Sequence, residues 1–335
     1  MEEISNSSKN GKNYYSSYDG MVPADEALAR SLNVPAVRML EDYGVARFQD
    51  RLKKLGLTTL HRPASEYGLT LILGGAEASL WDLAGAYAGM ARSLDQHHFN
   101  LGKATKNAFH RPFYLPNEQT QEDQWTETPA LSSAAIWQTF NSMIELNRPE
   151  TEVGWRDFVS SRKLAWKTGT SFGFRDAWAI GCTPEYVVAV WVGNADGEGR
   201  PGIVGVQAAA PLMFDVFNTL PANQGWFAAP YDKMRYLPVC HESGFRPSRF
   251  CPHLDTIWVP IAGERVAACR FHQPVKLDKT GTYRISDLCY PPFEGKEDTF
   301  LILPPLEQQY YRKKAPDLGL YQTGFQAVTL YSRMR

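Results

Sequence analysis

The sequence predicts a mixed α/β fold of the α+β type, in which an antiparallel sheet is flanked by helices. Two β-rich runs, 175–181 and 186–193, are joined by a tight turn at 182–185, a pattern typical of two antiparallel strands. Segments with helical periodicity lie before and after this pair along the chain. With 335 residues, of which 44% are hydrophobic, the chain is long enough for two or three domains.

The helices are indicated by their ends and by their apolar faces. Helix 26–30 stops near Leu32, and Pro35 begins a second helix that Gly44 ends in the usual C-terminal position. Three further helices are predicted: one after Ser79 and Asp82, which have the spacing of a capping box; one over 132–146; and one over 209–220, which closes the domain.

A Lys167-Thr168-Gly169-Thr170 run directly precedes the predicted pair of strands. A lysine and two hydroxyl groups on one strand edge can hold a substrate carboxylate, and glycine lets a ligand backbone lie close to that edge. The same four residue types recur at 279–282, where alternating residues flank an Asp-Lys-Thr-Gly turn. Hairpin geometry explains that second glycine, so Lys167 is the site candidate.

A Ser31-Leu32-Asn33 triplet lies upstream, on a short loop between the first two predicted helices. Side chains on such a loop can point into a cleft. Ordinary helix capping is the alternative explanation, since Ser and Asn are both favoured cap residues. The Lys167 motif further along the chain favours the interpretation as a site.

Together these motifs resemble the transpeptidase domain of class A penicillin-binding proteins, over roughly residues 13–222. The resemblance implies the penicillin-binding transpeptidase fold, which serine β-lactamases share. It also implies a division of the chain into a partial transpeptidase domain, 1–222, and a Cys-containing, β-rich extension, 223–335.

The resemblance further implies a role for each motif residue. Ser31 would pass a proton to the leaving amine, and Asn33 would contact the substrate amide. Lys167 would support the proton network, while the hydroxyls of Thr168 and Thr170 hold the terminal carboxylate beside Gly169, with the Thr170 N–H group in the oxyanion hole.

The nucleophile of the family is a serine in a Ser-x-x-Lys motif upstream of Ser-x-Asn. No such motif lies between Met1 and Ser31, and the sole match, Ser160-Ser-Arg-Lys163, follows Ser-x-Asn in a polar segment. We therefore expect a fold that is incomplete at its N-terminus and a chain that is inactive alone, because loss of a nucleophile costs several orders of magnitude in rate.

The predicted extension contains four of the five cysteines: Cys240, Cys251, Cys269 and Cys289. In a periplasmic protein such an even set suggests two disulfides, and we prefer the sequential pairing of Cys240 with Cys251 and Cys269 with Cys289. Zinc is the alternative because His241, His253 and His272 accompany the cysteines, although the cysteines form no paired Cys-x-x-Cys motifs. Cys182, beside the hairpin turn, is expected to be unpaired.

The expected partners follow from the resemblance. They are the peptidoglycan stem peptide ending in D-Ala-D-Ala and the β-lactams that mimic it, with no cofactor and no metal in the site. Nucleic acid is not expected, because 35 basic residues are balanced by 36 acidic ones. Members of the family are held at the inner membrane by an N-terminal anchor, and the resemblance therefore implies a periplasmic or cell-envelope location. We recognise no anchor and no targeting signal in this sequence.

The sequence therefore favours a D,D-transpeptidase fragment of a bifunctional cell-wall synthase, which in the family also carries a peptidoglycan glycosyltransferase domain. The first alternative is a catalytically inactive fragment or a module that binds peptidoglycan or a partner without chemistry. The second is a D,D-carboxypeptidase or a serine β-lactamase-like hydrolase, since these enzymes share the motifs.

Overall fold

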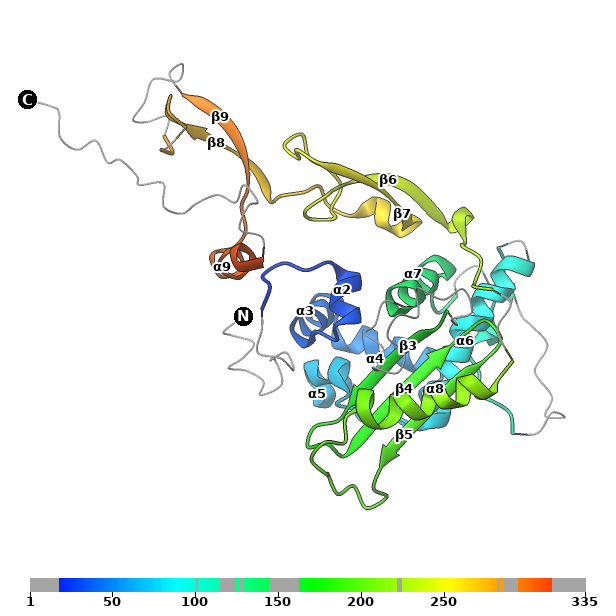
Figure 1. Ribbon diagram of the computed structural model, residues 1–335. Helices are drawn as coiled ribbons and strands as arrows, with labels where there is room; N and C mark the ends of the chain where they lie inside the picture. The colour runs from blue at the N-terminus through cyan, green and yellow to red at the C-terminus, as the bar shows by residue number, and fades with distance from the viewer. Residues whose placement is uncertain are drawn as a thin grey trace, which may run out of the picture. The chain divides into compact units, whose positions relative to one another are not determined.

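The computed structural model describes residues 18–100, 102–114, 125–126, 129–144, 163–221, 225–281, 283–285 and 295–314. These residues fall into two compact units (Figure 1). Unit 1 comprises residues 24–234, and unit 2 comprises residues 18–23 and 235–314. The domain boundary predicted at residue 222 stays a prediction.

Unit 1 is built on a three-stranded antiparallel sheet in the order β3-β4-β5. The strands are β3 (Ala165–Thr170), β4 (Asp176–Cys182) and β5 (Val187–Gly193). Lys167 lies opposite Ile180 in the β3–β4 register. The predicted antiparallel pair is confirmed as β4 and β5, and the motif strand is added to its edge.

Five of the described helices of unit 1 match the helical segments expected from the sequence, and two others, over 45–54 and 64–67, were not predicted. The described helices of this unit are α2 (Ala24–Ala29), α3 (Asn33–Tyr43), α4 (Val45–Lys54), α5 (Ala64–Tyr67), α6 (Leu80–Phe99), α7 (Ser133–Ile144) and α8 (Ala210–Thr219), with short 3₁₀ and π turns at 68–73 and 205–209. Gly44 ends α3 as predicted, with a φ of 94° and its N–H group donating to the Leu40 carbonyl. Ser79 caps α6, because its side chain accepts from the Asp82 N–H group at 3.0 Å.

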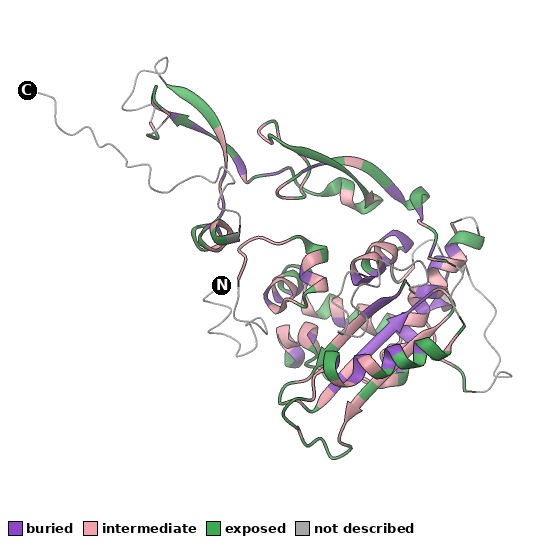
Figure 2. Ribbon diagram, viewed as in Figure 1, coloured by how far each residue is buried: buried purple, intermediate pink, exposed green. Residues whose placement is uncertain are grey.

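Helices cover both faces of the sheet (Figure 1). The Trp166 ring packs edge-on against Phe214 of α8, with ring centroids 5.1 Å apart. Gly181 of β4 faces the same helix, because a Cβ atom there would lie 2.6 Å from the Phe217 ring. Helices α6 and α7 lie against the opposite face. Buried residues lie along β4 and at the start of β3 (Figure 2), so the core of unit 1 reaches the residues that directly precede the motif.

Unit 2 contains two separate two-stranded sheets. The first pairs β6 (Met234–Cys240) with β7 (Leu254–Pro260), and the second pairs β8 (His272–Leu277) with β9 (Lys296–Leu301), followed by α9 (Pro305–Lys314). Most residues of β7 are exposed. The buried apolar cluster of this unit consists of Leu301 and Leu303, with Met21, Phe271 and Tyr311 packed against them. Unit 2 thus has a small hydrophobic core for its length.

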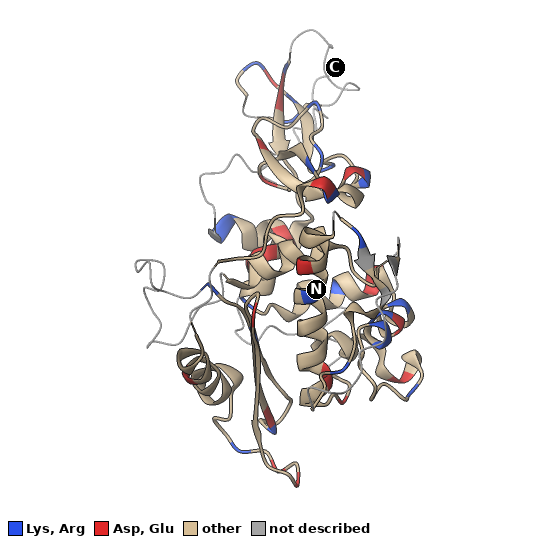
Figure 3. Ribbon diagram, turned by 90° about the vertical axis from the view of Figure 1, so that its right-hand side faces the viewer, with Lys and Arg blue, Asp and Glu red and all other residues tan. Residues whose placement is uncertain are grey.

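The second Lys-Thr-Gly copy forms a turn at the end of β8, as the sequence predicted. Gly281 has a φ of 73°, and its N–H group donates to the Asp278 carbonyl at 2.9 Å. Acidic and basic residues are interspersed over the described helices and strands (Figure 3). Within the described part of the chain, no helix combines the length and the apolar character that crossing a membrane requires.

Candidate active site

Ser31 lies in the connection between α2 and α3, in a backbone conformation that is uncommon for a residue other than glycine. Its φ is 54°. The Leu32 N–H group donates to the Ala27 carbonyl at 2.9 Å, and Leu32 occupies the N-cap position of α3 without a side-chain cap. Ser31 is therefore not a cap of α3. A strained conformation of this kind is typical of functional sites, where surrounding contacts maintain it.

The structure brings the two predicted motifs together through Lys167. Its Nζ atom donates a hydrogen bond to Ser31 Oγ at 2.5 Å and another to the Thr168 carbonyl at 2.9 Å. Strand alternation turns Lys167 toward the face of β3 that α7 and the Ser31 connection occupy. The hydroxyl and the ammonium thus form a direct polar pair between residues far apart in the sequence.

Burial alters the protonation chemistry of this pair. The loss of water around the ammonium lowers the pKa of Lys167 to about 8, from its usual 10.5. A lysine with this pKa exchanges its proton readily near neutral pH, and it can act either as an acid or as a base. The Lys167–Ser31 pair is therefore suited to moving a proton.

The remaining motif residues occupy the exposed end of β3. Thr170 Oγ1 accepts a hydrogen bond from the Gly205 N–H group at 3.0 Å, which leaves the hydroxyl proton available to donate. Gly205 lies so close that a Cβ atom there would be 2.5 Å from the Gly169 carbonyl. Among the described residues, no strand pairs with β3 on the side away from β4.

Asn33 is the first residue of α3, two positions after Ser31, and it is half-buried. Its position at the start of the helix that follows the Ser31 connection is the structural fact about Asn33, and its role in the site stays a prediction. Ser160, the remaining candidate nucleophile, lies outside the described residues. Gly205 was not anticipated, because no local pattern connects it with a strand more than thirty residues upstream.

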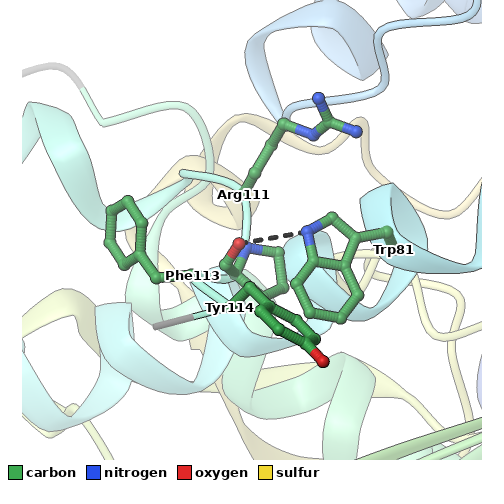
Figure 4. Close-up of a pocket in the computed structure, with 5 residues that line it drawn as sticks. Trp81, Arg111, Phe113 and Tyr114 are labelled. Carbon is green, nitrogen blue, oxygen red and sulfur yellow. Dashed lines mark hydrogen bonds between the residues drawn. The ribbon is translucent and has the colours of Figure 1, made fainter. Parts of the chain in front are cut away.

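A separate surface pocket is lined by Trp81, Arg111, Pro112, Phe113 and Tyr114 (Figure 4). Its shape is fixed in part by the Trp81 indole, which donates to the Pro112 carbonyl at 3.0 Å. None of the motif residues lines this pocket. The ionisable side chains among these five lining residues are Arg111 and Tyr114. The pocket therefore offers no acid–base pair comparable to that of Lys167 and Ser31.

The cysteines of the extension are arranged differently from the predicted disulfides. Cys240, Cys251 and Cys269 are free thiols, and Cys289 lies outside the described residues. Among the described residues, the group that could hold a metal ion consists of these three thiols and His272. Cys182 is a buried free thiol in β4, as expected. The Cys269-Arg-Phe-His272 spacing is the local signal that could have indicated this cluster.

A helix-flanked antiparallel sheet with a Ser-x-Asn loop against a Lys-Thr-Gly edge strand is the arrangement typical of the penicillin-recognising serine acyl-transferases. The comparisons with known proteins agree. Penicillin-binding protein 1C of Escherichia coli K12 is 38% identical over 208 residues, which cover 62% of this chain and 24% of that protein. Penicillin-binding protein 1A of Aquifex aeolicus is 31% identical over 195 residues, which cover 54% of this chain and 23% of that protein.

The crystal structure of penicillin-binding protein 1A from Haemophilus influenzae has the same fold, with a TM-score of 0.52 and 17% identity over 77% of this chain and 42% of that one. No protein-family model matches the sequence. The chain is thus related to the penicillin-binding proteins, as the motifs predicted, and it spans about a quarter of the length of the curated relatives it matches.

Proposed function

We propose that unit 1 carries the carboxylate-binding and proton-transferring half of a peptidoglycan D,D-transpeptidase site. The observation that carries this proposal is the hydrogen bond between Lys167 Nζ and Ser31 Oγ. It joins the two motifs that this chemistry requires, at a lysine whose pKa is lowered to about 8. The relatives are named for penicillin binding, and the substrate that we propose is a stem peptide ending in D-Ala-D-Ala, which a β-lactam resembles.

The substrate would lie along the edge of β3 that pairs with no described strand. An extended peptide can add to such an edge through main-chain hydrogen bonds. Its terminal carboxylate would meet the Thr170 hydroxyl, whose oxygen is held by the Gly205 N–H group, and the positive charge of Lys167. Thr168 and Gly169 continue this edge, and glycine adds no side chain that would hold the ligand away.

The proton route would run through Ser31. The acyl-transfer step needs a proton at the leaving amine, and the Ser31 hydroxyl can donate one while it accepts another from Lys167 Nζ. Asn33, at the start of α3, would contact the peptide amide. The attacking serine is not among the residues that the structure places at this site, so we propose that acyl transfer requires a serine in addition to these groups.

The proposal is tested by equilibrium binding of a D-Ala-D-Ala stem peptide, measured by calorimetry or NMR titration. Lys167→Ala is expected to weaken binding by about tenfold or more, because a hydrogen bond to a charged group contributes about 1.5–3 kcal/mol. Lys279→Ala is the matched control, since it removes the same residue type from the second Lys-Thr-Gly copy, which forms a turn in unit 2. Equal binding by both variants would refute the proposed site.

Intact mass after incubation with a penicillin separates binding from catalysis. If binding occurs without a mass increase, the chain provides the binding half of the site alone, and a non-catalytic role becomes the better description. A stable gain of one acyl group identifies a surviving nucleophile, and Ser160→Ala is then the first variant to examine. Turnover of the penicillin would instead support a hydrolase.

We also propose a cell-envelope location, with a periplasmic site, and a division into a partial transpeptidase domain over 1–222 and an extension over 223–335. The bacterial penicillin-binding proteins among the relatives support the location. Fractionation of bacterial cells that express the gene for this protein would test it, and recovery in the cytosol would contradict it.

A further inference from the structure

Four potential metal ligands converge in unit 2, in a group that we call the CCCH cluster: Cys240, Cys251, Cys269 and His272. Their sulfur and nitrogen atoms all lie within 4.8 Å of one another. Cys240 ends β6, Cys251 lies in the loop before β7, and His272 begins β8. Cys240, Cys269 and His272 are buried, and Cys251 is half-buried.

The spacing of these atoms matches tetrahedral zinc coordination. Cys240 Sγ is 3.4 Å from His272 Nδ1, and Cys269 Sγ is 3.5 Å from the same nitrogen. With Zn–S bonds of about 2.3 Å and a Zn–N bond of about 2.05 Å, a tetrahedron places sulfur and nitrogen about 3.6 Å apart and two sulfurs about 3.8 Å apart. These two separations are therefore already close to the tetrahedral value, and the remaining ligand atoms lie within 4.8 Å of one another.

Hydrogen bonds satisfy only part of this convergence. The Nδ1 atom of a neutral imidazole has at most one lone pair, so it can accept from one of the thiols of Cys240 and Cys269, while Cys240 Sγ also lies 3.4 Å from Glu242 Oε2. A disulfide does not account for it either, because three thiols share the site and any pair would leave one buried beside the histidine. A metal ion satisfies all four groups at once.

The surroundings of the cluster are polar groups suited to hold zinc ligands. Glu242 Oε2 is 3.7 Å from His272 Nε2 and 3.4 Å from Cys240 Sγ, and the Glu242 side chain is 5% exposed. A carboxylate behind the second ring nitrogen of a histidine is the usual support of a zinc-binding imidazole. The Ser243 hydroxyl donates to Cys269 Sγ at 3.3 Å, and the Ser248 N–H group donates to Cys251 Sγ at 3.3 Å.

We propose that the CCCH cluster binds one structural Zn²⁺ ion. Thiolate and imidazole ligands select a soft or borderline metal, and four protein ligands without an open position are characteristic of a structural site. The ion would join the end of β6 to the start of β8, and so connect two hairpins that are marginal as isolated two-stranded sheets. This inference is independent of the proposed transpeptidase site in unit 1.

Metal analysis of the full chain, purified without chelator, tests the proposal. We expect about one Zn²⁺ per chain, measured by inductively coupled plasma mass spectrometry. Cys251→Ser and His272→Ala should lose the zinc, whereas Cys182→Ala and His241→Ala should retain it. The controls are matched: Cys182 is a buried free thiol of unit 1, and His241 bonds to Asp255 instead of joining the cluster.

Two further measurements keep the test decisive if a ligand variant fails to fold. Removal of zinc from the native chain should lower the unfolding temperature of the β6–β9 region, and added Zn²⁺ should restore it. Added Co²⁺ should give the intense visible absorption of tetrahedral thiolate coordination. Less than about a tenth of a zinc per chain after addition of excess Zn²⁺, or disulfides detected by a mass change on reduction, would overturn the proposal.

Discussion

The lowered pKa of Lys167 has a measurable consequence for stability. In the folded protein the pKa is about 8, whereas in the unfolded chain the ammonium is hydrated and has its usual pKa of 10.5. At about 1.36 kcal/mol per pKa unit, this difference corresponds to about 3 kcal/mol. The charged form of Lys167 therefore destabilises the folded state by an amount of that order, and the neutral form does not.

The sign of the pH dependence follows from proton binding. Below pH 8 both states hold the proton, and the full cost is present. Between pH 8 and 10.5 the unfolded chain binds a proton that the folded chain has released, so the free energy of unfolding rises with pH. Above 10.5 both states are neutral at this position. We expect the Lys167 contribution to the free energy of unfolding to increase by up to about 3 kcal/mol between pH 8 and 10.5.

Urea denaturation of the wild type and of Lys167→Met, at several pH values between 7 and 10.5, measures this contribution. The difference between the two proteins at each pH cancels the titration of tyrosines, cysteines and the N-terminus. NMR titration of the lysine side chains gives the midpoint directly. A stability difference that stays constant with pH, together with a midpoint near 10.5, would show that the Lys167 ammonium is fully hydrated and would refute the reasoning.

Three shorter predictions concern the surroundings of the site. Ser31→Gly relieves the strain of positive φ, worth up to about 1 kcal/mol, but removes the acceptor of the Lys167 hydrogen bond, worth about 1.5–3 kcal/mol, so stability should fall by about 1–2 kcal/mol and stem-peptide binding should weaken; denaturation and calorimetry measure the two effects. Gly181→Ala should cost about 1–3 kcal/mol, because its Cβ would lie 2.6 Å from the Phe217 ring, whereas Gly169→Ala should be tolerated in stability, its nearest neighbour being 3.7 Å away; equal losses would contradict this. For Asp82, burial raises the pKa, but hydrogen bonds from Thr58 and the charge of Arg111 outweigh burial, and the net pKa is lowered. The wild type should therefore lose stability as the pH falls below about 3.8, where the carboxylate becomes protonated in the unfolded chain first. Asp82→Asn should remove this part of the pH dependence, which acid titration of unfolding would detect.

The sheet and the helices could be predicted because each leaves a local pattern. The β4–β5 pair has two β-rich runs around a turn, and α3 and α6 have recognisable ends at Gly44 and Ser79. Context also separated the two Lys-Thr-Gly copies: a motif followed by apolar strands is part of the sheet, and the copy at 279–281 forms a turn with Gly281 at positive φ. Local sequence was sufficient for these features because they depend on neighbouring residues.

The geometry of the site could not be predicted in the same way. The bond between Lys167 and Ser31 joins residues separated by 136 positions, and the lowered pKa of Lys167 results from packing by distant elements. Nothing in the Ser31-Leu-Asn33 triplet indicates that Ser31 has positive φ and leaves the cap position to Leu32. The motifs identified which residues meet, but the way in which they meet is a property of the tertiary structure.

The arrangement of the cysteines also depends on contacts between residues that are distant in the sequence. An even set of four suggested two disulfides, with zinc as the alternative because histidines accompany the cysteines, and the wide separations of Cys240, Cys251 and Cys269 favoured the disulfides. The Cys269-x-x-His272 pair was the one local indication, and its meaning depends on whether two distant thiols reach the same point. They do so because Cys240 ends the first strand of one two-stranded sheet and His272 begins the first strand of the next. A unit with so small an apolar cluster needs a cross-link of some kind, and free thiols gathered around an imidazole favour a metal over sulfur–sulfur bonds.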